Sequence, residues 1–205
     1  MNDQEYLNQI SSSVRPVKAP KQSGIMSSPI FKVALIGIVC FVVIAVLGAI
    51  VSGTRPNLES QVTALVLHLD NTSSVISNYQ GDVKSSSLRS SLASLNAVFS
   101  TTSKEVTSYL SDNYGYRSGA ASASLIAEAD AEKDELESDL FNAKISGTLD
   151  RIFAHKMAYE ITMVHSEEQA IYRVTSDAAL SHALESSMNS LSNLYDNFNN
   201  FSETK

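Results

Sequence analysis

Residues 33–51 read VALIGIVCFVVIAVLGAIV, and this run of nineteen residues without a charge decides the architecture of the chain. As an α-helix it would span about 28 Å, close to the thickness of the hydrocarbon layer of a bilayer. A helix buried in a globular core keeps some polar residues on one side, and this run has none. Ile30 and Phe31 extend it, and the Lys32 side chain can reach the interface. We therefore predict a transmembrane helix over residues 30–52.

Two other interpretations of the apolar run fit its surroundings less well. A cleaved signal peptide has a shorter apolar region near the N-terminus, and Val51-Ser52-Gly53 is only a weak match to a cleavage site. A lipid-modified cysteine follows a small residue, whereas Cys40 follows Ile38 and Val39. We interpret Cys40 as a small apolar residue inside the span. It is the only cysteine of the chain, which excludes an internal disulfide and a cysteine-based zinc site.

The cations that flank the run predict its orientation. Four of them precede it, namely Arg15, Lys18, Lys21 and Lys32, and only Arg55 follows closely. The positive-inside rule therefore places the N-terminus in the cytoplasm and the C-terminal part outside the cell membrane. The charge is divided in the same way, because residues 1–32 carry a net charge of +2 whereas residues 53–205 carry 11 basic and 20 acidic residues.

The predicted organisation has three parts. Residues 1–29 contain many Pro, Gly and Ser residues and few apolar ones, so we expect a disordered cytoplasmic stub whose cations contact anionic headgroups. Residues 30–52 form the transmembrane helix. Residues 53–205 form an extracytoplasmic helical bundle, long enough to fold alone.

The bundle is predicted from apolar residues that recur at spacings of three and four, which is typical of amphipathic helices. Pro56 suits the first turn of the first helix. Short polar turns separate five stripes, at residues 81–82, 113–115, 146–148 and 175–177. Thr148 is predicted to cap the helix that follows it, and the turn 175–177 is predicted to contain a cap. The third helix covers about 119–145. The stripes are Leu58, Val62, Leu65, Leu69, Ile76 and Tyr79; Leu88, Leu92, Leu95, Phe99, Val106 and Leu110; Leu125, Ala129, Leu136, Leu140 and Ala143; Ile152, Phe153, Met157, Ile161, Val164, Ile171 and Val174; and Leu180, Leu184, Met188, Leu191, Leu194, Tyr195, Phe198 and Phe201.

These features predict an all-α fold, with one N-terminal transmembrane helix followed by an antiparallel bundle of four or five helices. The number stays open because the third and fourth segments could form one kinked helix. The layout indicates two helical hairpins, the first and second helices and the fourth and fifth, which the third helix joins.

Part of the bundle resembles a known family. The residues that carry the likeness are Gly147, Asp150, Arg151, Met157, His165, Tyr172, Asp177, Leu180 and Leu191. They are similar to a family of bacterial envelope proteins that have a ferritin-like bundle and no assigned activity. The resemblance covers about a third of the chain and implies a ferritin-like topology. An N-terminal anchor in place of a cleaved signal is a departure from that family.

Histidines and carboxylates are the candidate ligands for a metal site. Di-iron sites of ferritin-like bundles use Glu-x-x-His on two helices, and this chain has only the reversed order, at His165/Glu168 and His182/Glu185. Glu168 falls on the apolar stripe, so a site built from His165, Glu168 and His68 is the candidate to consider. Because the ligand order is wrong, we expect no metal and no cofactor.

Other function classes find little support. The net charge of −7 argues against nucleic-acid binding, and no nucleotide-binding glycine loop or catalytic triad occurs, so we expect no enzyme. We interpret the acidic stretch 128–139 as a solvated helix face. The loop Tyr114-Gly115-Tyr116-Arg117 fits either a partner contact or packing over the bundle end.

The sequence therefore predicts a single-pass protein of the cell membrane, whose acidic bundle is a binding or scaffold module of the cell envelope. Its expected partners are the lipid bilayer and an envelope protein. The alternatives are a ferritin-like metal-binding or redox protein, and a sensor domain that works through a partner. The oligomeric state stays undecided.

Overall fold

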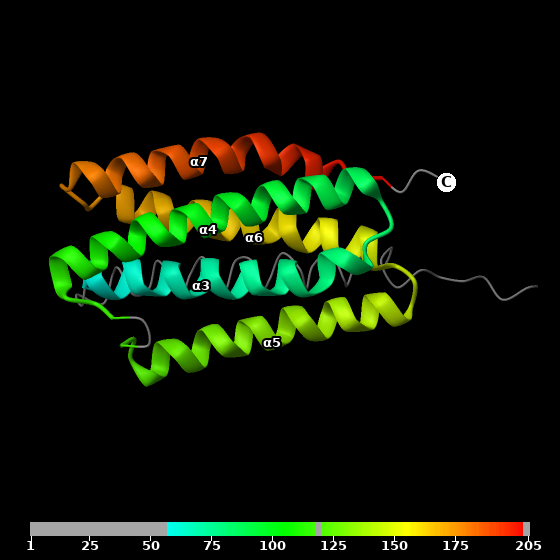
Figure 1. The fold of residues 1–205 in the computed structure, drawn as a ribbon, viewed down its shortest axis with the longest axis horizontal. Coiled ribbons are helices and arrows are strands. Elements are labelled where there is room, and N and C mark those ends of the chain that lie inside the picture. The colour runs from blue at the N-terminus through cyan, green and yellow to red at the C-terminus, as the bar shows by residue number, and fades with distance from the viewer. Residues whose placement is uncertain (1–56, 118–119, 203–205) are drawn as a thin grey trace, which may run out of the picture. The chain divides into compact units, whose positions relative to one another are not determined.

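The computed structural model describes residues 57–117 and 120–202 (Figure 1). All regular elements in these ranges are helical, which confirms the all-α prediction: α3 (Leu58–Tyr79), the 3-10 turn η2 (Gln80–Asp82), α4 (Ser86–Tyr114), α5 (Ala123–Ile145), α6 (Leu149–Tyr172) and α7 (Ala178–Asn199). The predicted stub, residues 1–29, and the predicted span, residues 30–52, lie outside the described residues, as does Pro56. None of the described helices has the length and apolarity needed to cross a bilayer.

Four of the helices form the bundle. Helix α3 packs against α4, α4 against α7, α7 against α6, and α6 against α3, and neighbouring helices run antiparallel (Figure 1). Helix α5 lies outside this group and contacts α3 and α6. The bundle is therefore four helices with a fifth laid along one side.

The chain path explains why α5 is long. Helices α3 and α4 form one hairpin and α6 and α7 a second, as predicted, and α5 carries the chain back along the length of the bundle between them (Figure 1). We call the end where α3 begins the proximal end; it contains Asn57, the α4–α5 loop and the turn 173–177. The distal end contains the turns 80–85 and 146–148 and residues 200–202. Helices α5 and α6 are two separate helices.

The predicted apolar stripes form the core. In α4 all six predicted residues are buried, and Phe99, Phe153 and Phe198 are fully enclosed. The prediction for Val174 is wrong: its side chain is 58% exposed because α6 ends at Tyr172 and Val174 lies in the following turn. Helix α5 buries only Leu136, Leu140 and Ala143, so it is bound far less deeply than the other four.

Helix ends follow the capping rules with one exception. Asn57, Ser85, Ser122 and Asp177 each accept a hydrogen bond from a backbone N–H of the first turn that they precede. The Ser122 cap starts α5 four residues later than predicted. Thr148 occupies the N-cap position of α6, but its side chain does not cap the helix. Its hydroxyl lies 2.9 Å from that of Ser146 instead.

The turn between α5 and α6 requires a glycine. Gly147 has φ +71°, a left-handed conformation that costs an L-residue free energy, whereas Gly81 lacks a positive φ and has open space around it. We expect Gly147→Ala to lower the free energy of unfolding by about 1 kcal/mol. The matched change Gly81→Ala should be neutral or slightly stabilising. Urea unfolding followed by circular dichroism measures both, and equal losses at the two positions would contradict the role of the turn conformation.

Candidate functional site

The structure separates the three residues that the sequence suggested as metal ligands. Glu168 is fully buried, and the polar side chain next to it is Ser187 of α7. His68 on α3 directs both ring nitrogens at carboxylates of α6, and His165 is half-buried on α6. Within residues 57–117 and 120–202, no group of three or more His, Cys, Asp or Glu side chains is placed to hold a metal ion.

His68 instead forms an ionic cluster with two glutamates. Its Nε2 lies 2.8 Å from Glu160 Oε2, and its Nδ1 lies 3.1 Å from each carboxylate oxygen of Glu167. Glu160 and Glu167 are seven residues apart, which places them two turns apart on one face of α6. An imidazole can donate from both nitrogens only when it is protonated. The geometry therefore fits an imidazolium that joins α3 to two successive turns of α6; we call these three residues the His68 cluster.

The electrostatics agree with that protonation state. Burial by itself lowers the pKa of His68, but the hydrogen bonds and charges of Glu160 and Glu167 outweigh it and raise the pKa to about 10. His68 is therefore a cation at neutral pH. With both nitrogens already donating to carboxylates, the ring has no lone pair for a metal ion or for accepting a proton.

Helix α5 closes the third side of the His68 cluster. A cavity of about 20 Å³ lies between α3, α5 and α6, and the polar side chains that line it include His68, Asn71, Glu132 and Glu160. Asn71 Nδ2 donates a 2.9 Å hydrogen bond to the carbonyl oxygen of Ala129, which ties α5 to α3. The cavity has room for one water molecule and is too small for a metabolite. The cluster therefore fits a structural role better than a substrate site.

Glu168 is a separate and unusual group. Its side chain is 0% exposed, and in the described part of the chain neither carboxylate oxygen has a hydrogen-bond partner with good geometry. The buried Ser187 hydroxyl is likewise unsatisfied. Burial raises the pKa of Glu168 to about 8; the nearby Ser187 hydroxyl opposes this rise, and the charge of Glu167 adds to it. Glu168 is therefore mostly a neutral acid at pH 7, and a neutral carboxyl group can be buried without a cation beside it.

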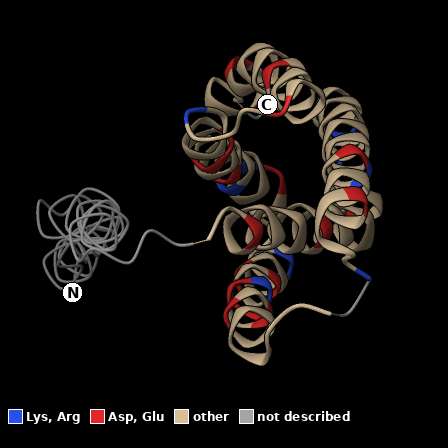
Figure 2. Cartoon of the chain, turned by 90° about the vertical axis from the view of Figure 1, so that its left-hand side faces the viewer, with Lys and Arg blue, Asp and Glu red and all other residues tan. Residues whose placement is uncertain are grey.

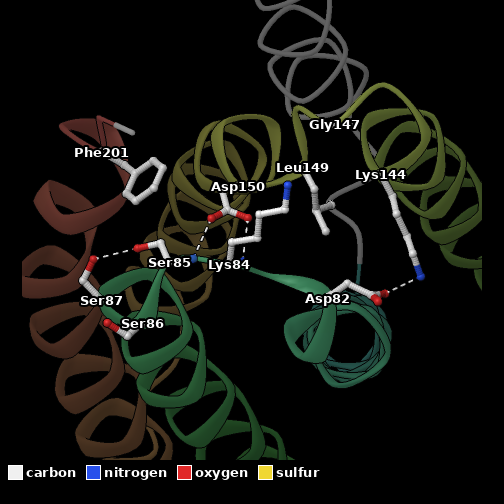
Figure 3. A pocket seen from close by; sticks show the side chains of 10 residues that line it. All are labelled: Asp82, Lys84, Ser85, Ser86, Ser87, Lys144, Gly147, Leu149, Asp150 and Phe201. Carbon is white, nitrogen blue, oxygen red and sulfur yellow. Dashed lines mark hydrogen bonds and ion pairs between the residues drawn. The ribbon is translucent and has the colours of Figure 1, made fainter. Parts of the chain in front are cut away.

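A cleft of about 710 Å³ lies at the distal end of the bundle (Figure 3). Asp150, the second residue of α6, accepts hydrogen bonds from the backbone N–H groups of Lys84 at 3.0 Å and Ser85 at 2.7 Å. Lys144 donates to Asp82 at 2.7 Å, which links the end of α5 to the α3–α4 turn. The charged groups of the cleft thus join the two turns to each other, and they form a brace for the hairpins.

The acidic stretch of α5 behaves largely as a solvated face. Five of its seven acidic residues are exposed, namely Glu128, Asp130, Glu132, Asp134 and Glu135. Asp139 pairs with Lys156 of α6, and Tyr79 of α3 donates to the carbonyl oxygen of Glu137 at 3.1 Å. These contacts are spread along the helix, so the stretch helps to hold α5 against α3 and α6 while its outer side faces solvent.

The tyrosine loop is divided between packing and exposure. Tyr116 packs against the core, whereas Tyr114 is 39% exposed. The Tyr114 ring meets the Tyr109 ring edge to face, with centroids 6.0 Å apart. Gly115, with φ +66°, turns the chain between Tyr114 and Tyr116.

Sequence reasoning missed the partners of His68. The available signal was a pair of glutamates seven residues apart on the predicted fourth helix, and a histidine that flanks the apolar stripe of the first helix. Spacing within one helix directed attention to His165 and Glu168 instead. The brace made by Asp150 was missed as well, because nothing local marks a carboxylate that accepts from another hairpin.

Comparison with known proteins adds no relative. No protein-family model matches the chain, and neither a curated protein nor a solved structure is similar enough to count as a match. The functional argument therefore depends on the residues of this chain alone.

Proposed function

We propose that the chain is a single-pass membrane protein of the cell envelope, anchored through residues 30–52 with its N-terminus in the cytoplasm. Its bundle would act outside the membrane as a binding or scaffold module. The observation that carries the proposal is the uncharged run 33–51 between a basic flank and a compact helical domain with excess acidic residues.

The described interior supports a module that works through its surface. The His68 cluster is paired internally, its adjoining cavity has room for only one water molecule, and the distal cleft is braced by hydrogen bonds and an ion pair of its own charged groups. Most charges of α5 point outward. Such a domain can recognise a partner through the exposed faces of its helices. Two antiparallel hairpins joined by a crossover helix also support the ferritin-like resemblance in topology, without its di-iron ligands.

The proposed topology predicts a simple protection pattern. Intact cells or spheroplasts that produce the chain with a tag before Met1 and a second tag after Lys205 are treated with protease. The C-terminal tag should be lost and the N-terminal tag retained, because the bilayer shields only the cytoplasmic side. The control is lysis with detergent, after which both tags should be digested. A C-terminal tag that survives on intact cells would contradict the orientation, and a chain extracted by alkaline carbonate would contradict the anchor.

A further inference from the structure

We infer that the proximal end of the bundle rests on the lipid headgroups of the membrane, with Tyr114, Tyr172 and Val174 at the interface and Arg117 and Arg173 beside the phosphates. This inference rests on the proposed anchor and deepens it. It assigns one surface of the bundle to one partner, the headgroup layer.

The length of the connecting chain limits where this end can lie. The apolar run ends at Val51 and α3 begins at Leu58, so six residues separate them. Six extended residues reach about 20 Å at most. The distal end is a further helix length away, about 33 Å for the 22 residues of α3. The start of α3 is therefore held near the membrane surface, together with the loops that share its end of the bundle.

The side chains at this end suit an interface. Of the six large hydrophobic side chains that are exposed in the described ranges, three lie here: Tyr114, Tyr172 and Val174. Tyrosine is enriched at the level of the headgroups because its ring is apolar and its hydroxyl remains hydrated. The two loops are neighbours, since Tyr109, which supports Tyr114, also interacts with Thr175 and Asp177 of the turn 173–177.

Charge separates the proximal end from the sides of the bundle. Figure 2 views the bundle from this end, with basic residues in blue and acidic residues in red. Arg117 and Arg173 are exposed in the two loops, where they offset two of the three negative charges of Glu59, Asp112 and Asp177. The outer side of α5 carries a row of exposed carboxylates, which anionic headgroups repel. An upright bundle on its proximal end therefore keeps the exposed carboxylates of α5 away from the plane of the headgroups.

The other exposed apolar pair does not compete for the same role. Phe141 and Ile145 lie in the last turns of α5, at the distal end. The lysine between them, Lys144, is paired with Asp82. The connecting chain also holds α3 by the opposite end, so this pair can meet the membrane only if the bundle lies on its side.

The absence of tryptophan from the chain allows a direct test. The full chain is reconstituted into vesicles of phosphatidylcholine and phosphatidylglycerol that contain phospholipid brominated near the headgroup. Three variants carry one reporter each: Tyr114→Trp, Tyr172→Trp and the distal control Ile145→Trp. The reporters at 114 and 172 should lose fluorescence through bromine quenching, and the reporter at 145 should not. Circular dichroism checks that each variant keeps its helix content.

The outcomes distinguish this inference from the proposed function. If the chain floats with the vesicles and no reporter is quenched, or all three are quenched equally, the proximal end does not rest on the headgroups. The anchor stands in either case. If the chain does not float with the vesicles, the anchor fails. A second variant, Arg117→Gln with Arg173→Gln, should reduce quenching at 172 in anionic vesicles only. Equal quenching with and without these arginines would remove them from the contact.

Discussion

The free energy of unfolding should fall by about 1 kcal/mol per pH unit between pH 5 and 6, and Glu168→Gln should remove most of this slope. Burial raises the pKa of Glu168 from 4.5 to about 8, so the folded bundle keeps a proton that the unfolded chain has already lost. Rising pH then favours the unfolded state. The contribution is complete below pH 4.5 and is lost as the pH rises through 8.

A second group extends the effect to higher pH and makes the assignment testable. His68 titrates at 6.5 when unfolded and at about 10 when folded, so its stabilising contribution is complete below pH 6.5 and is lost as the pH rises through 10. Below pH 6 the slope belongs mainly to Glu168, to which the raised pKa of the partly buried Glu132 adds, and above pH 8 it belongs mainly to His68. Together the two groups make the loss steepest between pH 6.5 and 8.

Urea unfolding of the full chain in a mild detergent, followed by circular dichroism at unit pH steps from 5 to 10, measures these slopes. The matched control is Glu185→Gln on α7, because Glu185 is exposed. That variant should keep the slope of the unsubstituted protein. A Glu168→Gln variant that retains the full slope below pH 6 would show that the buried carboxyl is ionised in the folded state.

Periodicity predicted the elements that bury a continuous stripe. Helix α4 is the clearest case, since apolar residues recur on one side in all but one of its central turns, and all six predicted residues are buried. Helix α5 is the weakest case, because only three of its residues are buried and its position depends on contacts with α3 and α6. A single helix pattern contains no information about which groove it will cover, so the four-plus-one arrangement required the structure.

The candidate site shows the same limit. The apolar neighbours Val164 and Ile171 placed Glu168 on the buried stripe of its helix, and its burial is confirmed. The pairing of His68 with Glu160 and Glu167 depends on the register between α3 and α6, which are joined through two other helices. Register between distant segments is set by the packing of whole helix faces. A motif within one helix therefore suggested the wrong partners for His68.

His68→Leu should lower the free energy of unfolding by about 3 kcal/mol at pH 7, because it leaves two carboxylates facing a position that no longer holds a cation. The Glu160 side chain is 14% exposed, so it keeps little hydration, whereas Glu167 is 36% exposed and partly solvated. Most of the loss should therefore come through Glu160. The control is His155→Leu, since His155 is exposed on α6. That change should shift stability by no more than about 0.5 kcal/mol.

The double variant His68→Leu with Glu160→Leu tests whether the ion pair adds net stability or only compensates for the cost of burying its two charges. Removing both charges also removes the desolvation cost of both, so an apolar replacement of a buried pair is often close to neutral. The double variant should therefore recover most of the stability that His68→Leu loses, which is a large interaction term in a double-mutant cycle. Its stability should also stop falling above pH 8, because His68 no longer titrates. The single variant Glu160→Leu completes the cycle. If the losses of stability in His68→Leu and in Glu160→Leu simply add in the double variant, the His68 cluster does not act as a unit, and apolar residues alone hold α3 against α6.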